Sequence, residues 1–99
     1  MPSASTIQNQ FAKALKRVRA ATGRTQEDFA LVSSRTYISS LERGQKSPTL
    51  KKIDELAQVL GIHPLTLLTL SYAVADSERF EDEILDSVKR ELSELRRRQ

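Results

Sequence analysis

The sequence predicts an all-α protein, and three observations support that prediction. Apolar residues recur at three- and four-residue spacing along most of the chain, as on one face of an α-helix. No segment alternates apolar and polar residues as a half-buried strand does. Ser, Thr, Pro and Gly stand at the ends of the periodic segments, where they cap, begin or terminate helices. We expect a five-helix domain over residues 6–75 and a further helix over residues 76–99.

The first two predicted helices are separated by Gly23, which supplies a left-handed stop. The first helix is expected from Thr6 to Thr22. Its apolar stripe consists of Ile7, Phe11, Ala14, Leu15, Val18 and Ala21. Thr25 can cap a short second helix, with Asp28 three residues later in a variant of the capping box. The inward candidates of this second helix are Phe29, Ala30 and Val32.

The third and fourth helices also have recognisable ends. Ser34 is a good N-cap for a helix that continues to about Arg43, and Gly44 ends it. The inward residues of that helix are Tyr37, Ile38 and Leu41. After a loop, Thr49 caps a fourth helix that ends at Gly61. The apolar residues of the fourth helix are Leu50, Ile53, Leu56, Ala57 and Leu60.

Two more helices complete the prediction. Pro64 can occupy the first position of a fifth helix that extends to Ala75. The last helix begins near Asp76 with a cluster of acidic residues, and its final residues are Arg96, Arg97 and Arg98. This order of charges complements the helix dipole. Three-four-three spacing, typical of a short coiled-coil seam, relates Leu85, Val88, Leu92 and Leu95.

Composition and charge narrow the class of function. The net charge is +3, but residues 1–52 contain ten Lys and Arg against three Asp and Glu, whereas residues 53–99 contain six against ten. A basic half suggests that one side of the protein binds an anion, although helical surfaces can also simply differ in charge. Cysteine is absent, which excludes disulfides and thiolate metal sites. The N-terminus lacks the pattern of a signal peptide and no stretch could span a membrane, so a cytoplasmic protein is expected.

Residues Leu15 to Leu68 resemble the lambda-repressor-like helix-turn-helix family of phage repressors, Cro proteins and small bacterial regulators. The resemblance depends on three stretches, LKRVRAATGRTQEDFA, RTYISSLERG and SPTLKKIDELAQVLGIHPLTLL, which occur in the family's order. The second stretch is also similar to the controller proteins of restriction–modification systems. The resemblance implies a DNA-binding domain whose third helix is the recognition helix, encoded by a bacterium, a phage or a plasmid.

The resemblance implies structural roles for some residues. Arg19 and Glu42 match a pair that joins the first helix to the third through a salt bridge in relatives. The alternative for Arg19 is a contact with a DNA phosphate. Gln26 stands where relatives have a glutamine that donates to a phosphate. Ala30 is small where the second and third helices must approach closely.

The outward face of the third helix supplies the candidate DNA contacts. A recognition helix contacts bases mainly from its N-terminal turn, so Arg35 and Thr36 are expected in the major groove. Arg35 can pair with guanine O6 and N7, although it could instead hold a phosphate. The full set of base-contacting candidates is Arg35, Thr36, Ser39 and Ser40. The phosphate-contacting candidates are Gln26, Ser34, Tyr37, Arg43, Gln45, Lys46 and Ser47. Ser34 could act only as a cap, Tyr37 could be packed, and Ser39 and Ser40 could be ordinary solvated serines.

One departure from the family concerns the turn before the recognition helix. In relatives the equivalent of Ile38 commonly follows that of Ala30 by ten positions, with a glycine in the turn. In this chain Ile38 follows Ala30 by eight positions, and Ser33–Ser34 replaces the glycine. Either the second helix ends early or the recognition helix loses its first residues. We favour the early end, because the RTYISSLERG match is unbroken.

The expected function is a dimeric, sequence-specific DNA-binding regulator, more specifically a repressor at a pseudo-palindromic operator. The candidate dimer interface comprises Leu67, Leu70, Tyr72, Leu85, Val88, Leu92 and Leu95. Alternatively, the last helix folds back over the fifth within one chain. A second class is an antitoxin that binds a toxin through its C-terminal helix and autoregulates its operon.

An enzyme is the third and weakest class. No Cys/His pair, metal-ligand cluster or phosphate-binding glycine loop is present in the sequence, and we expect no catalytic residue, no metal and no cofactor. His63, which precedes Pro64, is explained by a helix-capping or loop role.

Overall fold

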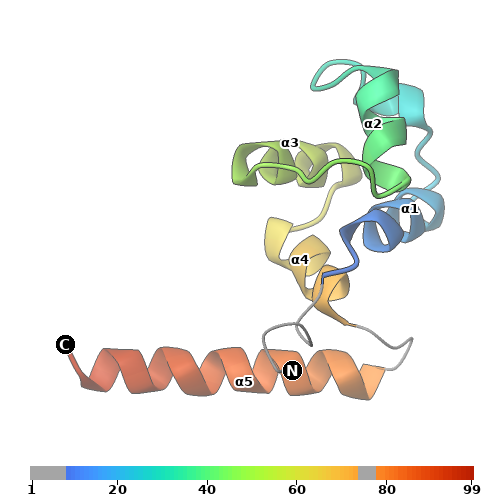
Figure 1. Cartoon of the computed structure of the whole chain (residues 1–99). Coiled ribbons are helices and arrows are strands. Elements are labelled where there is room, and N and C mark those ends of the chain that lie inside the picture. Colours follow the sequence, from blue (N-terminus) through green and yellow to red (C-terminus); the bar gives the residue numbers. More distant parts are fainter. Residues whose placement is uncertain (1–8, 74–77) are drawn as a thin grey trace.

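The computed structural model describes residues 9–73 and 78–99, and the regular elements of these residues are all helices. They are α1 (Phe11–Ala21), the single 3-10 turn η2 (Gln26–Phe29), α2 (Arg35–Glu42), α3 (Leu50–Leu60), α4 (Pro64–Tyr72) and α5 (Glu78–Arg97). The elements from α1 to α4 form a helical body, and α5 extends as a straight helix beside α4 (Figure 1). The all-α prediction is therefore confirmed. Within the described ranges, no helix is both long and apolar enough to cross a membrane.

A hydrophobic core connects η2 with the helices of the body. The side chains that are completely enclosed include Leu15 from α1, Phe29 from η2, Ile38 from α2, Leu56 from α3 and Leu67 from α4. Around them are buried Phe11, Ala14, Val18, Leu41, Ile53, Ala57 and Leu60. Most of these residues were predicted from helical spacing, because the apolar stripe of each short helix has to face this core.

The predicted caps of α2 and α3 are present. The Ser34 hydroxyl oxygen accepts the backbone N–H of Tyr37 at 3.1 Å, and the Thr49 hydroxyl oxygen accepts that of Lys52 at 3.1 Å. Each bond satisfies an N–H group that has no partner within its own helix. Gly44, which follows the C-cap residue Arg43 of α2, has a φ of 73°, a conformation in which a Cβ atom would cause strain. The boundaries of α2 and α3 thus follow from side-chain chemistry that is visible in the sequence.

The start of α4 shows the capping role expected of His63. The His63 Nδ1 atom accepts the backbone N–H of Leu65 at 3.0 Å, and Pro64 occupies the first helical position. The helix ends at Tyr72, before the predicted end at Ala75, which lies outside the described residues.

The corner between η2 and α2 is built without glycine. The second helix is reduced to η2, which ends at Phe29, and the N–H groups of Val32 and Ser33 both donate to the Phe29 carbonyl at 2.9 Å. Ser34 then has an extended backbone, with φ −76° and ψ 154°, and caps α2. The second helix therefore ends early and α2 keeps its first residues, as the unbroken RTYISSLERG stretch indicated.

Several predictions of burial and of helix ends were wrong. Ala21, Ala30 and Leu50 are exposed, and Leu50 keeps 74% of its surface accessible. Each lies at an end of a short element, where the chain departs from the geometry that places periodic residues on one face. Ala30 in particular follows the last residue of η2 and so does not mediate a close approach of two helices. The first helix begins at Phe11, not at Thr6, which lies outside the described residues together with Ile7 and Asp76.

The N-terminal part of α5 packs on α4. Between the two helices lies a shallow groove of about 310 Å³, lined by Leu65, Thr66, Thr69, Leu70, Glu81, Asp82 and Leu85. Farther along α5, the seam residues Val88, Leu92 and Leu95 are 45–57% exposed. The alternative that α5 folds back over α4 is therefore correct only for the first turns of α5.

Candidate nucleic-acid interface

The N-terminal turn of α2 presents polar side chains to solvent. Arg35 and Thr36 are exposed, and Ser39, one turn later, is half-buried. Ser40, which was predicted to lie on the same outward face, is only 7% exposed, so that placement is wrong. Because α2 packs against both α1 and η2, its inward face is wide enough to include Ser40 together with Ile38 and Leu41.

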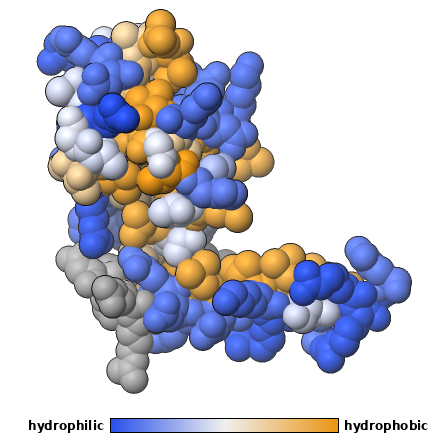
Figure 2. Space-filling view, turned by 180° about the vertical axis from the view of Figure 1, so that it is seen from behind, coloured by the Kyte–Doolittle hydropathy of each residue, from blue (hydrophilic) through white to orange (hydrophobic). Residues whose placement is uncertain are grey.

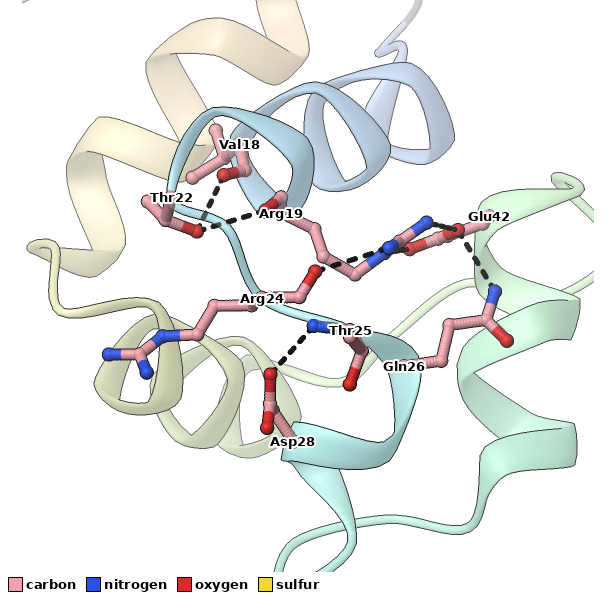
Figure 3. A network of polar contacts seen from close by, with 8 residues as sticks. All are labelled: Val18, Arg19, Thr22, Arg24, Thr25, Gln26, Asp28 and Glu42. Atoms are coloured by element: carbon pink, nitrogen blue, oxygen red, sulfur yellow. Dashed lines mark hydrogen bonds and ion pairs between the residues drawn. The ribbon is translucent and has the colours of Figure 1, made fainter.

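A network of charged hydrogen bonds fixes α2 to α1 and η2 (Figure 3). The Arg19 guanidinium donates to Glu42 through Nε at 2.5 Å and through Nη2 at 2.9 Å. A further guanidinium nitrogen donates to the carbonyl of Arg24 at 3.2 Å. The predicted Arg19–Glu42 pair is therefore present, and its two parallel bonds restrain orientation as well as distance. Because its guanidinium makes these bonds, Arg19 holds α2 in place against α1.

Gln26 completes this network. Its side-chain amide donates to the Glu42 carboxylate at 3.1 Å, from the first position of η2. The backbone N–H of its neighbour Thr25 donates to Asp28 Oδ2 at 2.6 Å. Gln26 was predicted as a phosphate contact, but in this structure its donor group is directed at Glu42. Three elements, α1, η2 and α2, are joined at one carboxylate.

The electrostatics of this carboxylate follow from its neighbours. Burial alone would raise the pKa of Glu42, whose side chain is 3% exposed. The hydrogen bonds from Arg19 and Gln26, with the positive charges of Arg19 and Lys16, outweigh burial and lower that pKa below its ordinary value of 4.5. The Glu42 hydrogen bond likewise raises the pKa of Arg19. The pair is therefore ionised at neutral pH, as a charge-assisted contact requires.

Arg35 forms an exposed ion pair with Glu27, a contact that the sequence alone did not predict. Its Nη1 atom lies 3.2 Å from Glu27 Oε1, and both side chains are about three-quarters exposed, at 70% and 74%. Both residues line a hollow of about 440 Å³ with Arg19, Thr25 and Gln26. An ion pair this exposed contributes only ~0–1 kcal/mol. The guanidinium can therefore leave Glu27 when a stronger acceptor is available.

A second cationic cluster surrounds Tyr37. The ammonium groups of Lys46 and Lys52 lie 5.7 and 5.8 Å from the centre of the Tyr37 ring. Lys52 also donates to the Val32 carbonyl and pairs with Glu55 at 2.9 Å. Through these contacts, Lys46 in the loop after α2 and Lys52 at the start of α3 lie close to Tyr37, and Lys52 also reaches Val32 in the corner before α2. The Lys52 ammonium is thus already bound within the protein, whereas Lys46 is exposed and can donate to a phosphate oxygen.

The end of α2 and the following loop add exposed donors. Arg43 donates to Ser39 Oγ at 2.6 Å and to Gln45 Oε1 at 3.2 Å. Gln45, Lys46 and Ser47 are exposed. These residues lie beyond the C-terminal end of α2, whereas Arg35 and Thr36 lie at its N-terminal end. The phosphate candidates Ser34 and Tyr37 also lie at the N-terminal end, so the predicted phosphate contacts are divided between the two ends of the helix.

Sequence reasoning missed Glu27 and Lys52. Glu27 is eight residues from Arg35, and Lys52 is twenty residues from Val32, so no periodic spacing relates the partners. The tight corner brings both pairs together. A pattern of residues within one helix could not have indicated either contact.

The fold and this site define a helix-turn-helix DNA-binding protein. Residues 15–67, more than half of the chain, match the helix-turn-helix family of the lambda-repressor-like type, and the chain belongs to it. It is thus a member of a family of DNA-binding transcriptional regulators, and its fold is one that binds double-stranded DNA.

Three known proteins are similar to this chain. A curated relative, the uncharacterized HTH-type transcriptional regulator y4dJ of Sinorhizobium fredii, is 46% identical over 55 residues, covering 54% of this chain and 71% of its own. The restriction-modification controller protein C.AhdI from Aeromonas hydrophila is 34% identical with a TM-score of 0.55, covering 66% of this chain and 98% of its own. The hypothetical transcription factor NHTF from Neisseria is 28% identical with a TM-score of 0.56, covering 69% and 80%. The family match ends at residue 67, so α5 lies outside it.

Proposed function

We propose that this protein is a dimeric, sequence-specific DNA-binding regulator, and specifically a repressor, that places α2 in the major groove of a pseudo-palindromic operator. The observation that supports the proposal best is the arrangement of α2. Its inner side is fixed by the Arg19–Glu42–Gln26 network, and its N-terminal turn presents Arg35 and Thr36 to solvent. A recognition helix contacts base edges mainly from that turn.

The base-contacting residues of the proposal are Arg35, Thr36 and Ser39. A guanidinium can donate two parallel hydrogen bonds to guanine, and a threonine methyl can contact a thymine methyl. Ser40 is left out of this group because it is buried. The proposed phosphate contacts are Ser34, Tyr37, Arg43, Gln45, Lys46 and Ser47.

The small size of the contact surface supports a dimer. One helix of eight residues offers few base contacts, so a second copy on a symmetric half-site is needed for tight binding. Of the predicted interface residues, Leu67 is excluded because it is fully enclosed in the core of its own chain. Leu70, Tyr72 and the seam residues of α5 remain in the proposal.

The experiment that tests the proposal changes Arg35 on an operator selected from random DNA. Arg35→Ala should weaken binding by roughly tenfold or more and relax the base preference at one position in each half-site, because a bidentate contact contributes ~1–3 kcal/mol of discrimination. Arg35→Lys is the matched control, since lysine keeps the charge but cannot make the bidentate contact. Full rescue by lysine, with the base preference intact, would show that Arg35 holds a phosphate instead.

A second candidate function is an antitoxin that binds a toxin through α5 and autoregulates its operon. The exposed seam of α5 is the observation that favours it. Purification of the protein from its native host distinguishes the two functions. A stoichiometric small partner that is lost from a variant with Leu92→Glu supports the antitoxin, whereas a homodimer that the same substitution dissociates argues against it.

A further inference from the structure

The face of α5 that carries the seam is apolar and largely uncovered. Leu85, Val88, Leu92 and Leu95 are 42–57% exposed, and a row of hydrophobic side chains follows one edge of α5 beyond the helical body (Figure 2). Among the described residues, the groove beside Leu85 brings the start of this face near another element, α4. Exposed apolar faces of this kind usually mark an interaction surface.

The charges of α5 are divided between its two ends. The first half of the helix contains Glu78, Glu81, Asp82, Glu83 and Asp86 against Arg79. The second half contains Lys89, Arg90, Arg96 and Arg97 against Glu91 and Glu94, and Arg98 follows directly. Acidic Glu81 and Asp82 also line the groove between α4 and α5, beside the apolar side chains of Leu65, Leu70 and Leu85. The groove is therefore lined by apolar side chains together with two carboxylates. A ligand that matches it is an apolar helical segment with positive charges.

We infer that the groove receives the C-terminal end of α5 from a second copy of this chain, so that two α5 helices pair in antiparallel orientation. The inference rests on the proposed dimer and specifies which surfaces form it. In an antiparallel pair the seam matches itself: Leu85 lies opposite Leu95 of the second copy, and Val88 lies opposite its Leu92. The two-fold axis then passes between the two seams midway between Val88 and Leu92, and both grooves are filled in the same way.

Charge complementarity favours this orientation over a parallel one. With Leu85 and Leu92 at heptad position a and Val88 and Leu95 at position d, Asp82 and Arg96 both occupy position e. In an antiparallel pair, the e positions of one helix face the e positions of the other. Asp82 thus lies near Arg96 of the second copy, at both ends of the dimer. A parallel pair would place Glu81 against Glu81 in the layer before Leu85 and would align the two helix dipoles unfavourably. The antiparallel pair also brings like charges together, because Lys89 faces Lys89 of the second copy and Glu91 faces its Glu91. These repulsive pairs occur only at the centre of the dimer, beside the two-fold axis.

A charge-swap experiment on the full chain tests the orientation by sedimentation equilibrium. Asp82→Arg and Arg96→Glu should each raise the dimer Kd on the order of tenfold, because each reversal replaces two attractive pairs by two repulsive ones. The double variant should return the Kd to within about threefold of the unchanged protein. In a parallel dimer the two positions are fourteen residues apart, about 21 Å along the axis, and no rescue would occur.

Glu83→Arg and Arg90→Glu are the matched controls, because both residues lie on the heptad position opposite the seam and should leave the Kd unchanged. The inference is overturned if the double variant dimerises no better than either single variant, or if all variants dimerise like the unchanged protein. A protein that stays monomeric at tens of micromolar overturns both the inference and the dimer of the proposed function. If the swap succeeds but Arg35→Ala leaves DNA binding unchanged, the antiparallel dimer stands and the proposed DNA contacts fail.

Discussion

At the scale of single residues, the most consequential contact is made by Glu42. Its carboxylate is enclosed, yet three donor groups from Arg19 and Gln26 satisfy it. Buried charge is unfavourable unless it is paired and hydrogen-bonded, and here both conditions are met. The result is a contact that depends on ionisation, so it should respond to pH.

We expect Glu42→Gln to lower the free energy of unfolding at pH 7 by ~1–3 kcal/mol, because charge-assisted bonds are lost and the guanidinium of Arg19 loses its counter-charge. The pKa of Glu42 is lowered by folding, so the contribution of the carboxylate is fully present above its ordinary pKa of 4.5 and is lost as the pH falls below that value. The difference between variant and unchanged protein should therefore shrink in acid.

Urea unfolding at pH 7 and pH 3 measures this difference. Glu27→Gln is the control, since the Glu27 side chain is 74% exposed and its loss should change stability little at either pH. A difference that stays constant between the two pH values would contradict the role assigned to Glu42.

At the scale of elements, the corner before α2 depends on Ser34. Because the Ser34 side chain accepts the N–H of Tyr37, Ser34→Ala should lower the free energy of unfolding by about 0.5–2 kcal/mol. Ser34→Asp keeps an N-cap acceptor and should retain stability. Its negative charge should weaken DNA binding, because in the proposed complex this end of α2 enters the major groove of the DNA. Thermal unfolding and DNA titration of the two variants separate these effects. Equal stability of the alanine and unchanged proteins would mean that the corner is held by other contacts.

Much of this architecture could be predicted from the sequence, because each helix carries its own periodicity and end residues. Ser34, Thr49, Pro64 and Gly61 mark boundaries through local chemistry, and local chemistry acts within a few residues. The Arg19–Glu42 pair was also predicted, but from the family resemblance and not from spacing, since 23 residues separate the partners.

The errors arose where burial depends on neighbouring elements. Helical periodicity alone does not show that α2 is covered on two sides, and so Ser40 was assigned to the outward face. Leu50 fits the apolar stripe of α3, yet it is the first helical residue and extends past the core. Leu67 was assigned to an interface because its helix is apolar on several faces, although α1 and α3 already enclose it. Tertiary packing, which the sequence does not display directly, decided these cases.

At the scale of the whole molecule, charge is separated along the chain. Residues 1–52 hold most of the excess positive charge and include the proposed DNA contacts, whereas the first turns of α5 are acidic. A charge distribution of this kind orients a protein as it approaches DNA, because the basic side is attracted and the acidic side repelled. The effect weakens as salt increases.

We expect Lys46→Ala to weaken binding to all DNA sequences alike. Each lost phosphate contact should reduce the slope of log K against log salt concentration by ~0.9, so a dimer with two such contacts should lose about twice that amount. Binding measured at several salt concentrations gives the slope. Arg90→Ala removes the same charge from α5 and serves as the control. If Lys46→Ala and Arg90→Ala gave the same slope as the unchanged protein, the loop after α2 would not contact phosphates.

The network at Glu42 also has an evolutionary consequence. It fixes the orientation of α2 from the inner side of the helix, while Arg35 and Thr36 contribute almost nothing to the core. Substitutions at these two positions can therefore change which base pairs are preferred at little cost in stability. A lineage of such proteins can acquire new operators by exchanging two exposed side chains, and the scaffold that presents them need not change.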